Sequence, residues 1–188
     1  VPTYQFVYNV SVTTYDGEQS IDGGVTEVYD AYQTKTEYYY SKDFRINEIK
    51  RCNKGGFPVT KEKLGWSFHG NLLHRGFHNG QGSYYMCRKY TYDDRGNIIV
   101  DRFYGNLTGR QSKSFRLEAD DKMLSKGIEC HEKSFTYNDL NLVTQEVDGE
   151  REIHYTYCPG TNLMSSKITK VSGAIYSREF YAYNEDNI

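Results

Sequence analysis

The chain has 188 residues, a formal net charge of -2 and 26% charged side chains, with lysines and glutamates mixed along it. This balance gives no basic surface of the kind that nucleic acid or anionic lipid binds, so we expect no nucleic-acid partner. No apolar run approaches the roughly 20 residues that cross a bilayer, so we expect no membrane span. The 19 tyrosines and only 3 prolines favour a sheet protein with two hydrated faces.

One short motif recurs in chain order: an aromatic or apolar residue, a spacer, an aromatic residue, a polar turn, and an aliphatic residue five or six positions on. Its copies are Thr13, Tyr15 and Ile21; Tyr38, Tyr40 and Ile46; Leu64, Trp66 and Leu72; Tyr90, Tyr92 and Ile98; Phe115, Leu117 and Met123; Phe135, Tyr137 and Leu142; Tyr155, Tyr157 and Leu163; and Tyr181, Tyr183 and Ile188. Successive copies begin 20 to 26 positions apart. Such a period indicates a repeat array.

Each copy predicts a β-hairpin. Ile153, Tyr155 and Tyr157 alternate with polar residues, which is the period of a half-buried strand, and residues 4–12 alternate in the same way. The segment after the second aromatic residue is rich in Asp, Asn and Gly, which favour turns, and an apolar strand such as residues 98–100 follows.

An isolated hairpin is marginally stable in water, so the repeats must pair edge to edge. We therefore predict an all-β fold in which tandem hairpins form one long, twisted antiparallel sheet of a dozen or more short strands. Residues 1–188 are expected to form a single domain cut from a longer array. A helix over residues 117–133 is the weaker alternative to a hairpin there, because Gly127 interrupts it.

The clearest copy, Tyr90-Thr91-Tyr92-Asp93-Asp94-Arg95-Gly96-Asn97-Ile98, resembles the unit of the RHS or YD-repeat proteins at every position. Elsewhere, Asp follows the second aromatic residue only at Asp16, and a matching turn glycine occurs only at Gly70. On this resemblance the motif residues with a structural role are Tyr15, Tyr38, Tyr40, Trp66, Tyr90, Tyr92, Gly96, Asn97, Tyr137, Tyr155, Tyr157, Tyr181 and Tyr183.

The resemblance implies a strip of a spiral β-shell. In secreted bacterial toxins of this family the shell encloses a toxic C-terminal domain, and in animal teneurins it forms part of an adhesion receptor. The implied function is a non-catalytic structural segment, secreted or on the cell surface, whose partners are the rest of the parent shell and the enclosed toxin domain. The alternative is an extracellular recognition module that binds carbohydrate or a protein through exposed Tyr and Trp, including Trp66 and Phe68.

Catalytic and cofactor motifs are absent from the sequence, which contains no Gly-x-Ser-x-Gly and no Walker-type phosphate loop. His69, His74 and His78 lie in the glycine-rich stretch 65–82 and, with Cys87, suggest a metal site. No supporting residues are evident, so we favour solvated loop histidines without a metal.

The four cysteines, Cys52, Cys87, Cys130 and Cys158, lack the two-residue spacing of zinc or redox sites. We favour free buried thiols over two disulfides. The carboxylate pairs Asp93 with Asp94 and Asp120 with Asp121 are interpreted as turn formers in preference to calcium ligands.

A strip of sheet has two end strands with unpaired backbone groups, here expected near residues 4–12 and 176–183. We therefore expect self-association through an end strand, unless a bulge or charged residues such as Arg178 and Glu179 protect that edge.

Overall fold

The computed structural model describes residues 4–15, 18–78, 83–110, 114–116 and 128–184. The predicted hairpin after Phe115 and the carboxylates Asp120 and Asp121 lie outside the described residues, as does Ile188. Side chains of residues 12–21, including Tyr15, are likewise not described.

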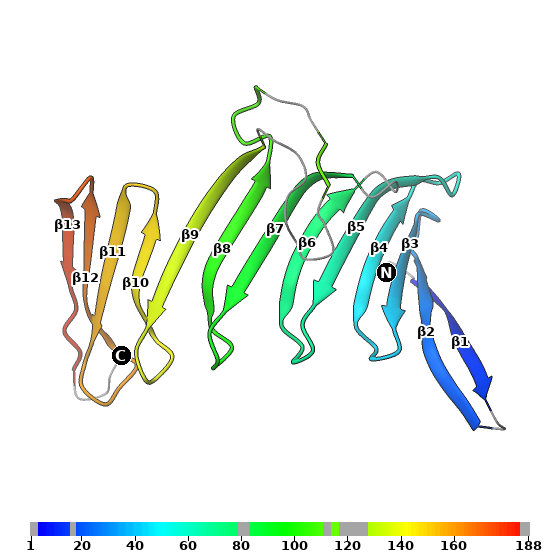
Figure 1. Ribbon diagram of the computed structural model, residues 1–188, viewed down its shortest axis with the longest axis horizontal. Helices are drawn as coiled ribbons and strands as arrows, with labels where there is room; N and C mark the ends of the chain where they lie inside the picture. The colour runs from blue at the N-terminus through cyan, green and yellow to red at the C-terminus, as the bar shows by residue number, and fades with distance from the viewer. Residues whose placement is uncertain (1–3, 16–17, 79–82, 111–113, 117–127, 185–188) are drawn as a thin grey trace. The chain divides into compact units, whose positions relative to one another are not determined.

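The sheet has 13 strands, and its strand order follows the chain from β1 to β13 (Figure 1). The strands are β1 (Gln5–Tyr15), β2 (Glu18–Tyr29), β3 (Lys35–Ser41), β4 (Ile46–Cys52), β5 (Pro58–Trp66), β6 (Leu72–His78), β7 (Tyr84–Tyr92), β8 (Ile98–Gly105), β9 (Glu129–Tyr137), β10 (Val143–Asp148), β11 (Arg151–Tyr157), β12 (Met164–Val171) and β13 (Ala174–Phe180). Sequence neighbours pair antiparallel, as in β1 with β2 and β11 with β12. The all-β prediction is confirmed. Within the described residues, no helix has the length and apolar character required to span a bilayer.

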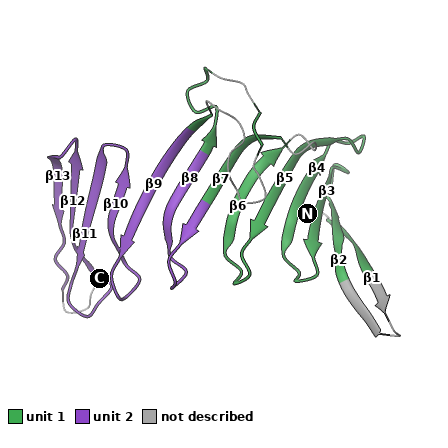
Figure 2. Ribbon diagram, viewed as in Figure 1, with its two compact units in different colours: residues 1–89, 104–129 green, residues 90–103, 130–188 purple. Residues whose placement is uncertain are grey.

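The chain forms two compact units (Figure 2). Unit 1 comprises residues 1–89 and 104–129, and unit 2 comprises residues 90–103 and 130–188. Each unit contains several copies of the motif. The expectation of a single domain stays a prediction.

One turn geometry recurs in several hairpins. In unit 2, the Asp93 N–H donates to the Asn97 carbonyl over 2.9 Å, and the Gly96 N–H donates back to the Asp93 carbonyl over 3.0 Å. The same pair of bonds closes residues 41–45, 53–57, 67–71 and 138–142. The fourth residue of such a turn has a positive φ, 84° at Gly96, and the register shifts by one residue next to the turn, as in a hairpin with a G1-type bulge.

In several motifs, the second aromatic residue donates a hydrogen bond to the preceding hairpin. In unit 2, the Tyr157 hydroxyl donates to the Val143 carbonyl over 2.7 Å, and the Tyr183 hydroxyl donates to the Met164 carbonyl over 2.8 Å. In unit 1, the Trp66 indole N–H donates to the Ile46 carbonyl over 2.7 Å. These bonds satisfy carbonyl groups at the starts of strands, so the aromatic residue of one repeat caps the repeat before it.

The glycine-rich stretch is largely strand, so the interpretation of His74 and His78 as solvated loop residues is wrong. Both lie in β6, and the His78 side chain is only 9% exposed. The reason is the residue opposite: His74 pairs with Gly65, where a β-carbon would overlap the imidazole ring. Glycine therefore provides space for a ring that covers the backbone of the neighbouring strand. His69 does lie in a turn.

A small hydrophobic core in unit 1 joins β7 to the segment around Phe115. Phe115 and Tyr84 exchange both backbone hydrogen bonds, 2.7 and 2.9 Å, and their rings stack 6.0 Å apart. Cys87 is fully buried beside them. All four cysteines are free thiols, and Cys52 and Cys87 are buried, whereas Cys130 is exposed, so the expectation of burial is wrong there.

Candidate functional site

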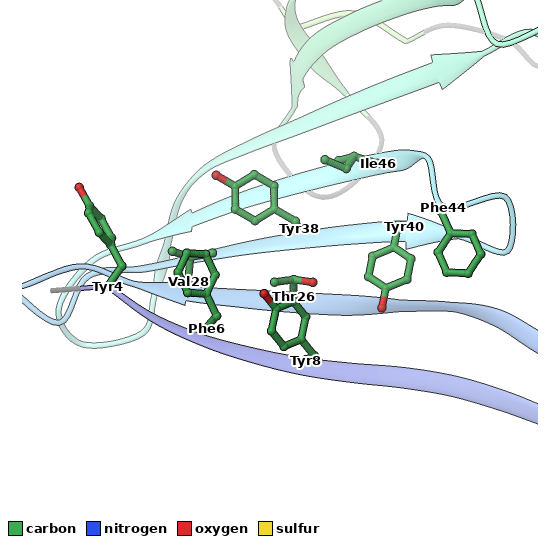
Figure 3. A pocket seen from close by; sticks show the side chains of 9 residues that line it. All are labelled: Tyr4, Phe6, Tyr8, Thr26, Val28, Tyr38, Tyr40, Phe44 and Ile46. Carbon is green, nitrogen blue, oxygen red and sulfur yellow. The ribbon is translucent and has the colours of Figure 1, made fainter.

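One hollow of unit 1 is an apolar groove on one face of β1 to β4 (Figure 3). Alternate residues of neighbouring strands build it, because the register pairs Phe6 with Val28 and Tyr8 with Thr26. The groove residues are Tyr4, Phe6, Tyr8, Thr26, Val28, Tyr38, Tyr40, Phe44 and Ile46, and they enclose about 570 Å³. The motif tyrosines of β3 thus form the floor, and the rings of the β1 segment form one wall.

The groove rings are open to solvent. Tyr4, Phe6 and Tyr8 are 58%, 54% and 68% exposed. Large apolar side chains grouped in this way mark contact surfaces more often than scattered exposed residues do. The groove therefore has the chemistry of a surface that another apolar element covers.

Phe44 at the rim occupies a turn position that is Gly70 and Gly96 in two other copies and Asn141 in a third. Its φ is 58°, the left-handed conformation of the fourth turn residue, where Gly70 and Gly96 occur in equivalent turns. A bulky residue there carries a conformational cost on the order of 1–2 kcal/mol. The ring stacks on Tyr40 with centroids 6.2 Å apart and is 66% exposed. A strained, exposed ring at the groove edge is typical of a functional contact.

The opposite face of the same strands is polar. Lys35 lies between two carboxylates, 2.6 Å from Glu37 and 3.1 Å from Glu27. The hydrogen bond to Glu37 and then that to Glu27 raise the pKa of Lys35, so this amine stays charged over the physiological range. The sheet in this part of unit 1 therefore has one apolar face and one face of paired charges.

A second, more polar hollow of about 490 Å³ lies near Trp66. Arg45 spans it and donates to the Ser67 carbonyl over 2.7 Å and to the Phe68 carbonyl over 3.3 Å. Phe68 is 92% exposed beside Asp43 and Asn47. This hollow combines an aromatic surface with hydrogen-bonding side chains.

Several of the predicted motif residues occupy strand ends. Tyr92, Tyr137 and Tyr157 are the last residues of β7, β9 and β11. Gly96 and Asn97 form the turn after β7, while Tyr181 and Tyr183 follow β13. Burial raises the pKa of Tyr137 and Tyr157, so their hydroxyls remain protonated donors at neutral pH.

The motif residues do not all meet at one site. Only Tyr38 and Tyr40 line the groove, and Trp66 lines the second hollow. No motif in the sequence marks Phe6, Val28 and Phe44 as groove residues, although the alternation of residues 4–12 places Tyr4, Phe6 and Tyr8 on one face. Among the described residues, no group of three or more His, Cys, Asp and Glu side chains is arranged to hold a metal ion.

Comparison with known proteins identifies the fold. No family model matches the chain, and no curated protein is significantly similar in sequence. Two crystal structures of TcdB2-TccC3 are similar: one with Cdc42, at 18% identity and a TM-score of 0.51, and one without the hypervariable C-terminal region, at 16% identity and a TM-score of 0.52. Each match covers 87% of this chain and 9% of the TcdB2-TccC3 chain. The chain therefore has the fold of part of the TcdB2-TccC3 chain.

Proposed function

We propose that this chain is a non-catalytic wall segment of an RHS-type β-shell that encloses a toxin or other cargo polypeptide, in a protein that is secreted or displayed at the cell surface. The observation that carries the proposal is the recurrent hydrogen bond from the second aromatic residue of one repeat to the main chain of the preceding hairpin. A linked series of hairpins is suited to forming a continuous wall.

Two further observations support the proposal. The fold is similar to that of TcdB2-TccC3, of which this chain spans less than a tenth of the length. The apolar face of β1 to β4 provides a surface on which an apolar part of a cargo chain or of the shell can pack. Partners are therefore the rest of the parent shell and the enclosed polypeptide.

Limited proteolysis of the full-length parent protein tests this role. The cargo should resist cleavage while the shell is folded and become sensitive when the shell is loosened by Tyr157→Ala, which removes both a ring and its bond to Val143. Tyr157→Phe keeps the ring and should leave most of the protection. Equal cleavage of the cargo before and after shell denaturation would refute the wall function.

A second candidate function, carbohydrate recognition, is favoured by the hollow near Trp66. The bond from the Trp66 indole to the Ile46 carbonyl fixes that ring, while Phe68 is almost fully exposed beside Asp43 and Asn47. An aromatic platform with adjacent polar side chains suits a sugar ring.

A glycan array with the 188-residue chain separates the two functions. Selective binding that Phe68→Ala abolishes would support recognition. The matched control is Phe57→Ala, which removes another exposed ring from a turn outside this hollow. Uniformly weak signals for all three proteins would leave the wall function as the better account.

A further inference from the structure

The apolar groove continues into a hollow that contains a charged residue. This hollow, of about 410 Å³, shares Val28 and Tyr38 with the groove and is also lined by Arg51, so we call it the Arg51 hollow. The register explains the continuity. Tyr38 pairs with Ile49 and Thr36 pairs with Arg51, so alternate residues of β4 place Arg51 on the groove face. The apolar surface therefore ends at a guanidinium group.

The residues that form this surface lie on inner strands of the sheet. Val28 is in β2, Tyr38 and Tyr40 are in β3, and Arg51 is in β4, and each of these strands has a neighbour on both sides. Figure 3 shows Tyr40 beside Phe44 at one end of the groove and Val28 toward the other end. The surface thus runs along the strands, from the turn after β3 toward Arg51.

A buried carboxylate holds Arg51 in place. Glu62 is fully buried, and its Oε2 lies 3.4 Å from a terminal nitrogen of Arg51. The Arg51 side chain is nevertheless 47% exposed, and its other nitrogens make no hydrogen bond to any residue that the structure describes. A guanidinium group that is oriented by one carboxylate and has unused N–H donors is well placed to bind a second carboxylate.

The other two charged residues that line the Arg51 hollow are already engaged. Lys35 is paired with Glu27 and Glu37. Asp30 accepts hydrogen bonds from the N–H and the hydroxyl group of Thr34. Among the charged residues of this hollow, Arg51 is therefore the one whose donors point to an anionic ligand. A matching ligand combines apolar groups, which fill the groove, with an acidic group at one end.

We infer, on the basis of the proposed wall function, that the enclosed polypeptide lies along β3 on this face and binds Arg51 through an Asp or Glu side chain, while its apolar side chains fill the groove. Thr36, opposite Arg51, is four residues from Tyr40, which corresponds to about 13 Å along the strand. An extended segment spans that distance in about four residues. The expected segment has two apolar residues at alternate positions and an acidic residue two positions further on.

A weak contact is sufficient for this role. An enclosed polypeptide is confined beside the wall, so its effective concentration is high and weak individual contacts are occupied. The pair between Arg51 and an acidic side chain then fixes the position of the segment more than it adds affinity.

Photo-cross-linking in the full-length parent protein tests the inference. With p-benzoylphenylalanine in place of Tyr40, we expect cross-links to the enclosed polypeptide, and mass spectrometry should locate them within about four residues of an Asp or Glu. The matched control has the same substitution at Tyr39, the next residue of β3, which faces the other side and contacts Glu37 and Lys50. Position 39 should give no cross-link to the enclosed polypeptide.

Arg51 variants test the acidic contact. Arg51→Gln should lower the cross-linking yield at position 40 about twofold to fivefold, the range expected for a partly exposed ion pair, and Arg51→Lys should retain most of the yield. Replacing the identified acidic residue by glutamine should have the same effect as Arg51→Gln and add nothing to it, because the two side chains form one contact. Arg178→Gln, at an exposed position of β13, is the control and should leave the yield unchanged.

Three results would overturn the inference: cross-links from position 40 to the shell alone, equal cross-linking of the enclosed polypeptide from positions 39 and 40, or an unchanged yield in Arg51→Gln. Each variant should keep the native circular dichroism spectrum, since Arg75 still contacts Glu62 when Arg51 is replaced. In all three cases the wall function still holds if the cargo of the unaltered parent protein resists proteolysis. Loss of that resistance would instead refute the wall function itself.

Discussion

At the scale of single residues, the side chain that starts each turn explains why the motif tolerates variation. Asp93 Oδ1 accepts hydrogen bonds from the N–H groups of Arg95 and Asn97, at 3.0 and 2.8 Å. Asn138 Oδ1 accepts the equivalent pair from Leu140 and Leu142, both at 3.0 Å. Asp and Asn are thus equivalent as acceptors, and loss of the motif Asp leaves the turn intact.

Because Asp can be protonated and Asn cannot, replacing Asp93 should change how the stability of the protein depends on pH. The Asn97 side-chain amide, followed by backbone donors, lowers the pKa of Asp93. Its folded-state pKa is below the unfolded value of about 3.9, so its stabilisation is present above that pH and is lost as pH falls through the folded value.

In thermal melts at neutral pH, Asp93→Ala should lower the midpoint of unfolding, whereas Asp93→Asn should leave it largely unchanged. As the pH falls into the acid range, the midpoint of Asp93→Asn should drop less steeply than that of the wild type. The control is Asn138→Asp, which should make the protein more sensitive to acid. A steeper acid decline in Asp93→Asn than in the wild type would contradict the role assigned to this carboxylate.

Tyr157 tests the ring and its hydroxyl separately. Tyr157→Ala removes a half-buried ring and should destabilise the protein by roughly 2–4 kcal/mol, and Tyr92→Ala, at the end of β7, should have a similar effect. Tyr157→Phe removes only the bond to the Val143 carbonyl and should cost about 1 kcal/mol. Urea denaturation measures each value. If Tyr157→Phe costs as much as Tyr157→Ala, packing of the ring contributes little.

At the scale of strands, the sequence predicts most of the fold because alternation and turn chemistry are local. The alternation of residues 151–157 and the turn at 93–97 both occur as predicted. The strand position of His74 depends instead on Gly65, nine residues away in sequence and directly opposite in the sheet. The groove could not be predicted from the sequence either. The sequence of one strand does not determine which of its two faces is left uncovered, because that depends on the neighbouring strands.

Glu62 is another residue whose environment only the register reveals. Its neighbours in sequence are Lys61 and Lys63, which are typical of a solvated strand. Its side chain is nonetheless fully buried, between Arg51 of β4 at 3.4 Å and Arg75 of β6, whose Nε contacts Glu62 Oε1. A buried carboxylate needs such partners to offset its desolvation.

Removing the closer partner should therefore be costly. Arg75→Met keeps the apolar stem but leaves the Glu62 carboxylate with one distant partner, and we expect a loss of about 3 kcal/mol in urea denaturation. Arg51→Met should cost less, because that contact is longer. Glu62→Gln in the Arg75→Met background should restore part of the loss, since it removes the buried charge. No recovery would show that the arginine acts through packing alone.

His78 is predicted to make the protein less stable in mild acid. Burial lowers the pKa of His78, and Lys61, Lys63 and Lys50 act in the same direction, against the opposing effect of Glu48. The folded-state pKa is thus below the unfolded value of about 6.5, so stability is full above that pH and falls as pH drops toward the folded value. The free energy of unfolding should decline between neutral pH and about pH 5, and His78→Gln should reduce that slope.

At the scale of the whole molecule, the sequence predicts a linear strand order, and the structure has it. Stability in such an array is approximately a sum over repeats and the contacts between neighbours. The aromatic-to-carbonyl bonds are contacts of this kind, because each joins one repeat only to the hairpin before it.

Because the same type of aromatic-to-carbonyl hydrogen bond joins one repeat to the hairpin before it, the array can change length by whole repeats during evolution. Removing residues 138–157 would join Tyr137 directly to the turn that begins at Cys158, so β9 would take the place of β11 beside β12. The Tyr137 bond to the Ile98 carbonyl and the Tyr183 bond to the Met164 carbonyl would both remain. We expect this shortened chain to fold, as judged by circular dichroism and a cooperative urea transition, whereas a deletion ten residues shorter should not. Gene duplication and unequal recombination can thus adjust the number of repeats without redesigning any one of them.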